Sequence, residues 1–159
     1  MALRKPLVLN SGTIEQLQAG DTLDAVVSEV DVIAMTNNSG ATINICHAVY
    51  CGGANQANAA VASAIASSRV IGFAKETIAD ANTGNFQTSG VMNATTGQWD
   101  AVTGGTGGLT AGSPYYLSDA ASGNITTTAP SASGNYLTFV GYAVSTTDLM
   151  INPDRPVKL

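Results

Sequence analysis

Two short stretches of this sequence decide its fold: Val70–Ala74, which reads VIGFA, and Phe139–Ala143, which reads FVGYA. Each is an apolar block with a glycine at its third position and an aromatic residue directly after the glycine. The preceding segments match as well, since 46–50 aligns with 112–116 about 66 positions later, whereas the glycine blocks lie about 69 positions apart. A repeat with one small insertion predicts two copies of a β unit.

The segments around this repeat predict an all-β fold. Short β-branched and aromatic stretches alternate with turn residues every 8 to 12 positions, which is typical of a compact antiparallel β-sandwich or barrel. We expect Gly72 and Gly141 to be structural glycines at bulges or sharp bends, because a glycine inside a strand usually marks one. The expected strands are 23–35, 41–51, 69–78, 85–92, 115–117, 124–128, 136–145 and 149–151.

Two segments are harder to interpret. Residues 54–68 fit a short helix or a weak strand, and the repeat favours strand or loop there because the matching segment near 125–128 is rich in β-formers. Residues 93–108 contain five glycines and are predicted to be a loop.

The chain divides into an N-terminal arm and a body. Residues 1–25 are expected to be the arm, because their periodicity is too weak for a helix and they are punctuated by Pro6 and Gly12. Residues 26–159 are expected to form one β-rich body, with 41–78 and 108–151 as its related parts. A length of 159 residues suits one domain with a real core.

Composition narrows the classes of function. Charged residues make up 11% of the chain, against about 25% in an average soluble domain, so the surface is hydroxyl-rich or covered by other copies. A net charge of −5 without a basic stripe argues against nucleic-acid binding. No apolar stretch approaches the roughly 20 residues of a membrane span, and no secretory segment is evident, so we expect a soluble protein made in the cytoplasm.

Few residues could support catalysis or bind a metal. His47 is the only histidine, and Cys46 and Cys51 are the only cysteines. If these residues share a strand, the two cysteines are about 16 Å apart, too far for a disulfide, and Cys46 and His47 point to opposite faces. We therefore expect reduced, mostly buried thiols, no metal site, no cofactor and no catalytic residue, and we do not expect an enzyme.

Other candidate motifs are also weak. The loop 104–110 resembles a phosphate-binding loop but lacks the terminal Lys-Ser or Lys-Thr pair. The carboxylates Asp100, Asp119 and Asp148 are scattered along the chain. Aromatic residues are more promising as contacts: Trp99, Tyr115 and Tyr116 are predicted to pack in the core or in a subunit interface, and a sugar-stacking platform is the alternative.

Several segments together resemble a known class of protein. The segments 6–12, 16–23, 70–74, 87–91 and 108–118, with 140–143, are similar to those of small tailed-bacteriophage virion proteins, above all capsid decoration (cement) and head-fibre proteins. The resemblance covers nearly the whole chain.

This resemblance implies a structural role. A decoration protein would bind the major capsid protein on the outside of the virion, commonly as a homotrimer, and stabilise the assembled shell by mass action. The arm would clasp the capsid protein or a neighbouring subunit, and its candidate contact residues are Arg4, Lys5, Leu7, Leu9, Leu17, Asp21 and Leu23. The alternative is a tail-fibre or head-fibre module that attaches to host-surface glycan or to another fibre protein.

Overall fold

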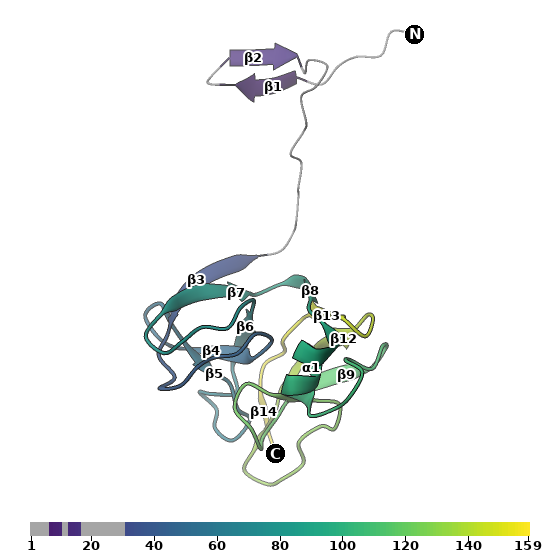
Figure 1. The fold of residues 1–159 in the computed structure, drawn as a ribbon. Coiled ribbons are helices and arrows are strands. Elements are labelled where there is room, and N and C mark those ends of the chain that lie inside the picture. The colour runs from purple at the N-terminus through teal and green to yellow at the C-terminus, as the bar shows by residue number, and fades with distance from the viewer. Residues whose placement is uncertain (1–6, 11–12, 17–30) are drawn as a thin grey trace.

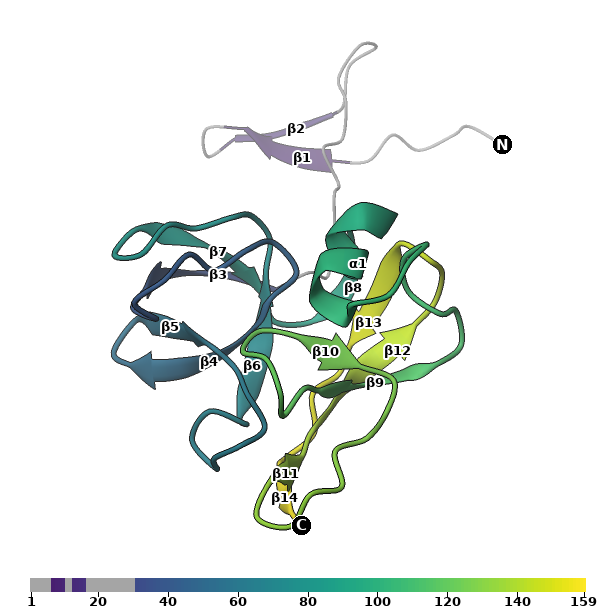
Figure 2. The ribbon, with the colours of Figure 1, turned by 60° about the horizontal axis from the view of Figure 1, so that its bottom comes forward.

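The computed structural model describes residues 7–10, 13–16 and 31–159. The fold is all-β apart from one short helix in the described residues, as the strand pattern predicted. A closed barrel and an open sheet lie side by side in the body (Figures 1 and 2). The strands are β1 (Leu7–Asn10), β2 (Thr13–Gln16), β3 (Val32–Asn37), β4 (Ala48–Gly53), β5 (Gln56–Ala59), β6 (Val70–Ala74), β7 (Thr83–Gln87), β8 (Gly90–Asn93), β9 (Pro114–Leu117), β10 (Ile125–Thr126), β11 (Tyr136–Leu137), β12 (Phe139–Ala143), β13 (Asp148–Ile151) and β14 (Val157–Lys158).

The barrel contains β3, β5, β4, β6 and β7 in that order. It closes because β3 pairs with β7 in the antiparallel sense and with β5 in the parallel sense. The side chains inside it are small or branched, with one aromatic ring, so they fill a narrow interior. They are Met35, Ile43, Val49, Ala57, Ala74, Ile78 and Phe86.

The open sheet repeats the barrel strand for strand. Its order, β10, β9, β12, β13 and β8, matches β5, β4, β6, β7 and β3. The registers agree as well: Val49 pairs with Gly72 in the barrel, and Tyr115 pairs with Gly141 in the sheet. In both strand pairs, β4 with β6 and β9 with β12, the register shifts directly before the glycine. Two related β units are therefore present, and they correspond down to single residue pairs, but they are wider than the predicted 41–78 and 108–151: the first also includes β3 and β7, and the second also includes β8.

The repeated glycines are required by close backbone approach. A Cβ atom on Gly72 would overlap the carbonyl oxygen of Gln87, and a Cβ atom on Gly141 would overlap the carbonyl oxygen of Met150. In each case the obstacle is the neighbouring strand, which a side chain cannot push aside. Each glycine also follows a register shift against the strand on its other side, β4 or β9, so both occupy the kind of position at which a strand needs glycine.

The two units differ in how they close. In the open sheet β8 and β10 do not pair, and helix α1 (Thr96–Thr103) follows β8 and contacts β10. The prediction of a loop over 93–108 was therefore wrong for residues 96–103, whereas 104–108 do form a loop. Thr95 and Gln98 form a capping box at the start of the helix, and Gly104 ends it at φ 69°. The Thr-x-x-Gln spacing was the available signal for this helix.

The main core lies between the two units. The outer face of the barrel contributes Ala48 and Phe73, and the inner face of the sheet contributes residues such as Leu149. Trp99 of α1 lies at the centre, fully buried, with its ring edge-to-face against Phe73 at 6.5 Å. The indole Nε1–H donates a hydrogen bond of 2.8 Å to the carbonyl of Thr147 in the turn between β12 and β13.

Several boundaries differ from the sequence prediction. The strand expected over 41–51 begins only at Ala48, because Cys46 adopts φ 68°, a left-handed turn conformation. The matching residue in the second unit is Gly112, at φ 78°. The strand expected over 85–92 is two strands, β7, which already begins at Thr83, and β8. The strand expected from 23 is described only from Asp31 onward.

Substituting either repeated glycine by alanine should destabilise the protein. We expect Gly72→Ala and Gly141→Ala each to lower the free energy of unfolding by about 3 kcal/mol, the upper range for overpacking, because the obstructing atoms belong to the backbone. Gly97→Ala in α1 is the control: nothing lies within 4 Å of its Cβ position, so this helix substitution should stabilise by about 1 kcal/mol. Urea denaturation measures all three, and equal effects would contradict the steric argument.

Trp99 should hold the two units in one cooperative structure. We expect Trp99→Ala to cost about 3–5 kcal/mol through the cavity it leaves. Trp99→Phe keeps a ring against Phe73 and loses the hydrogen bond to Thr147, so it should cost clearly less. Unfolding followed by far-ultraviolet circular dichroism and by hydrogen exchange should remain a single transition in wild type. Two separate wild-type transitions would show that the units fold independently.

Candidate functional site

Most of the predicted arm contacts lie outside the described residues. These are Arg4, Lys5, Leu17, Asp21 and Leu23. Leu7 and Leu9 lie in β1, whose backbone pairs with β2 through Leu7 with Gln16 and Leu9 with Ile14. The role of the arm in binding a partner stays a prediction.

The predicted interface aromatics are mostly core residues. Trp99 is 0% exposed and Tyr115 2% exposed, so both lie in the core, one of the two placements expected for them, and neither ring can reach a partner or a sugar. Tyr115 instead uses its hydroxyl to accept a hydrogen bond from the backbone N–H of Thr110. Tyr116 is half-buried. The exposed aromatic residue is Tyr142, and its alternation with buried Gly141 and Ala143 in the predicted strand was the signal for it.

The cysteines and the histidine do not form a reactive group. Both cysteines are free; Cys46 is buried, and burial raises its thiol pKa to about 12. Cys51 is exposed, so the expectation of buried thiols was wrong for it. His47 precedes β4, its ring lies against Gly123, and its Nδ1 atom is buried without a hydrogen-bond partner. Within the described residues no cluster of three His, Cys, Asp or Glu side chains is arranged to hold a metal ion.

The glycine-rich loop after α1 already binds an anionic group of the chain itself. The backbone N–H groups of Gly107 and Gly108 donate hydrogen bonds of 3.1 and 2.7 Å to the two carboxylate oxygens of Asp100. These amides are the donors that a phosphate-binding loop would offer. The loop therefore fastens the end of α1. No helix in the described part of the chain is long and apolar enough to cross a membrane.

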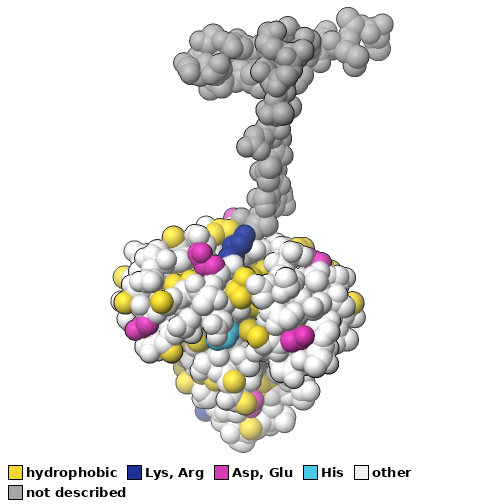
Figure 3. Space-filling view, viewed as in Figure 1, with side chains coloured by type: hydrophobic (Ala, Val, Ile, Leu, Met, Phe, Trp, Pro, Cys, Tyr) yellow, Lys and Arg dark blue, Asp and Glu magenta, His cyan; other side chains and the backbone are white. Residues whose placement is uncertain are grey.

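One candidate binding surface lies where the described body begins. The arm-side patch consists of Val32, Ile33 and Val91, which are 43%, 39% and 46% exposed. Asp31 is fastened beside it, because its carbonyl accepts hydrogen bonds from the backbone N–H and hydroxyl of Thr88 at 2.8 and 3.2 Å. Charged side chains adjoin this patch, because Asp31 directly precedes Val32, and Lys75 and Glu76 line a hollow together with it; elsewhere on the face in Figure 3 charges are few.

A second candidate surface lies on the outer side of the open sheet. The distal groove, a hollow of about 470 Å³, is lined by aromatic, aliphatic and polar side chains of β9, β12 and the C-terminal segment. Phe139 lies between Tyr142 and Tyr116, at ring distances of 4.9 and 6.1 Å. β14, which contributes Val157 to the groove, lies at the end of the body opposite β3 and β8 (Figures 1 and 2). At its other end the groove approaches the first surface, because exposed Tyr142 pairs with Met150, which in turn pairs with Val91 on the same face of the open sheet.

Comparison with models of protein families and with curated protein sequences finds no match to this chain. Its function therefore has to be argued from its own residues. The described part of the body offers two surfaces suited to binding, the arm-side patch and the distal groove, and its single histidine lies apart from both.

His47 should make the protein less stable in mild acid. Burial lowers the pKa of His47 from its usual 6.5, so the folded protein binds this proton more weakly than the unfolded chain does. The contribution of neutral His47 to the free energy of unfolding should be fully present above about pH 6.5. It should decrease as the pH falls from that value towards the lowered pKa. The decrease in melting temperature between about pH 7.5 and 5.5 should shrink in His47→Gln, which cannot titrate there. An unchanged decrease would contradict this assignment.

Proposed function

We propose that this protein is a structural virion protein that binds the outside of a bacteriophage capsid and stabilises the shell as a decoration protein. Its partners are the major capsid protein and further copies of itself, arranged as a homotrimer on the capsid exterior. The resemblance of its sequence segments to decoration and head-fibre proteins supports this proposal, and so does a body with two units fixed to one core.

The main support for the proposal is that β3 begins with two exposed apolar side chains, one on each face of the strand. Val32 and Ile33 are consecutive, so their side chains point to opposite faces of the strand, and both are exposed. A strand that is apolar on both faces is normally covered on both faces. Val91, which occupies the position of Val32 in the second unit, is exposed in the same way. Exposed aliphatic side chains at corresponding positions of both units support a contact with another protein here.

Binding alone accounts for stabilisation of the shell. A protein that binds the assembled shell and not its separated subunits shifts the equilibrium towards the shell, without any chemical step. In this proposal the arm and the arm-side patch both contact the capsid protein. Asp31 lies beside the patch, because Thr88 and Ser89 donate hydrogen bonds to it. The opposite end, with β11 and β14, then points away from the shell.

The experiment uses shells of the encoding phage assembled without this protein. Wild-type protein should co-sediment with the shells to saturation and raise the temperature at which they open. The full-length double variant Val32→Asn/Ile33→Asn should bind at least about tenfold more weakly, because it loses the burial of two aliphatic side chains. Val144→Asn is the matched control, since Val144 is 53% exposed and lies outside the patch.

Two results would contradict the proposal. If wild-type protein did not bind the shells but bound purified fibre proteins, the alternative of a fibre module would replace it. If the double variant saturated the shells as wild type does, while remaining folded by near-ultraviolet circular dichroism, the arm-side patch would not be the contact surface.

A further inference from the structure

The distal groove occupies a face that is buried in the other half of the molecule. Tyr142 in β12 corresponds to Phe73 in β6, because each pairs with the matching residue of the preceding strand, Pro114 and Ala48. Trp99 and the second unit cover Phe73, which is 0% exposed. Tyr142 is 45% exposed, so the described part of the chain leaves this aromatic face open.

Polar side chains with free hydrogen-bonding capacity border the aromatic rings. The segment after β13 is held against β12, because the backbone N–H groups of Asn152 and Asp154 donate to the carbonyls of Val140 and Phe139 at 3.1 and 3.0 Å. This fixes where Asn152, Asp154 and Arg155 lie along the groove. Within residues 31–159 the structure gives these three side chains no hydrogen bond. They offer an amide, a carboxylate and a guanidinium to a ligand.

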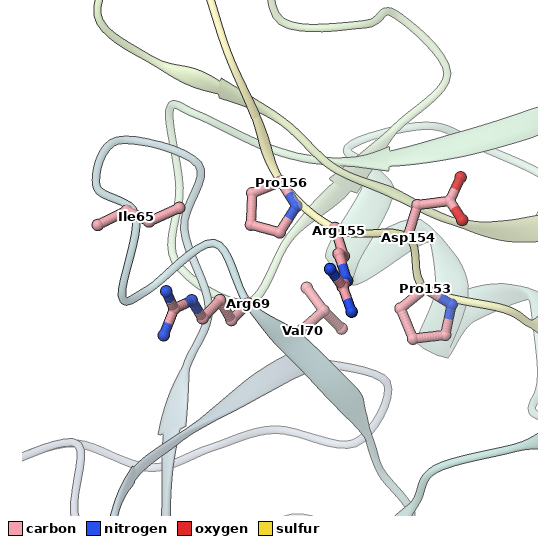
Figure 4. Close-up of a pocket in the computed structure, with 7 residues that line it drawn as sticks. All are labelled: Ile65, Arg69, Val70, Pro153, Asp154, Arg155 and Pro156. Atoms are coloured by element: carbon pink, nitrogen blue, oxygen red, sulfur yellow. The ribbon is translucent and has the colours of Figure 1, made fainter.

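Arg155 also gives the groove a positive end. It lines a second, adjoining hollow of about 480 Å³ together with Arg69, which comes from the segment before β6. Asp154 is the acidic side chain among the described residues that line this hollow, and its carboxylate points away from both guanidinium groups (Figure 4). Two arginines therefore face one hollow in a chain whose net charge is −5. Planar guanidinium groups favour carboxylates, which they bind through paired hydrogen bonds.

We propose that the distal groove and this adjoining hollow bind a saccharide that carries a carboxylate. The sugar ring lies against Tyr142 and Phe139, its hydroxyls bond to Asn152 and Asp154, and its carboxylate binds Arg155, with Arg69 beside it. Sugar hydroxyls both donate and accept, which suits an amide, an acceptor-only carboxylate and a donor-only guanidinium in one groove. An apolar peptide side chain would leave all three unpaired.

The test of this site does not require a capsid. The Val157 end of the groove lies in β14, opposite β3 and β8 (Figures 1 and 2), whereas its Tyr142 end lies two strands from Val91 of the arm-side patch. Saccharide binding is measured on the isolated full-length protein, so the result does not depend on whether the protein binds capsids.

Calorimetric titration with trigalacturonate and with 3′-sialyllactose tests the proposal, with lactose as the neutral comparison. At least one acidic sugar should bind more tightly than lactose. Arg155→Gln should weaken acidic-sugar binding by about tenfold or more, as expected for loss of a charge-assisted hydrogen bond. Tyr142→Ala should weaken the same binding, because the ring loses its contact surface. Lys158→Gln and Val144→Ala, which alter exposed residues outside both hollows, should change affinity by less than about twofold.

Three results would overturn the proposal. The first is that neither acidic sugar gives a heat of binding at concentrations up to about 10 mM, which is well above the Kd expected even for a weak specific site. The second is binding that survives both Tyr142→Ala and Arg155→Gln in variants that remain folded by near-ultraviolet circular dichroism. The third is displacement of a bound sugar by hexaglutamate at equal concentration, which would identify the site as a contact for an acidic protein segment.

Discussion

The packing of Trp99 against Phe73 is the contact on which the rest of the structure depends. It joins α1, which belongs to the second unit, to β6, the strand of the first unit that carries the repeated glycine. The hydrogen bond from the indole Nε1–H to Thr147 ties the same side chain to the turn after β12. One buried ring therefore links the barrel, the helix and the open sheet. Aromatic side chains can do this because they bury a large area in a fixed geometry.

The same contact explains why two related units have different surfaces. In the barrel, β3 and β5 pair and close the interior, so the unit needs no helix of its own. In the open sheet the corresponding strands, β8 and β10, stay apart, and α1 covers the gap. Once α1 lies between the units, the Phe73 face is buried and the equivalent Tyr142 face is left open. The asymmetry of the repeat thus creates the distal groove.

The two binding surfaces suit different partners for a physical reason. The arm-side patch is aliphatic, and burial of aliphatic side chains is non-directional, so it suits a large protein surface. The distal groove combines aromatic rings with amide, carboxylate and guanidinium groups, whose bonds are directional. It therefore suits a small ligand that carries many hydroxyls and a charge.

The sequence by itself determined the all-β class, the two related units, and the role of Gly72 and Gly141, because strand periodicity and glycine position are local properties of the chain. It also contained the capping box of α1, at Thr95 and Gln98, but the surrounding glycines obscured this signal. Only the tertiary structure decided that Trp99 and Tyr115 are buried while Tyr142 is exposed. Each of these residues has an aromatic ring in or beside a predicted strand, and which face is covered depends on the position of the other unit. Arg69 and Arg155, far apart in sequence, line one hollow for the same reason: long-range packing places them there, and no local pattern predicts it.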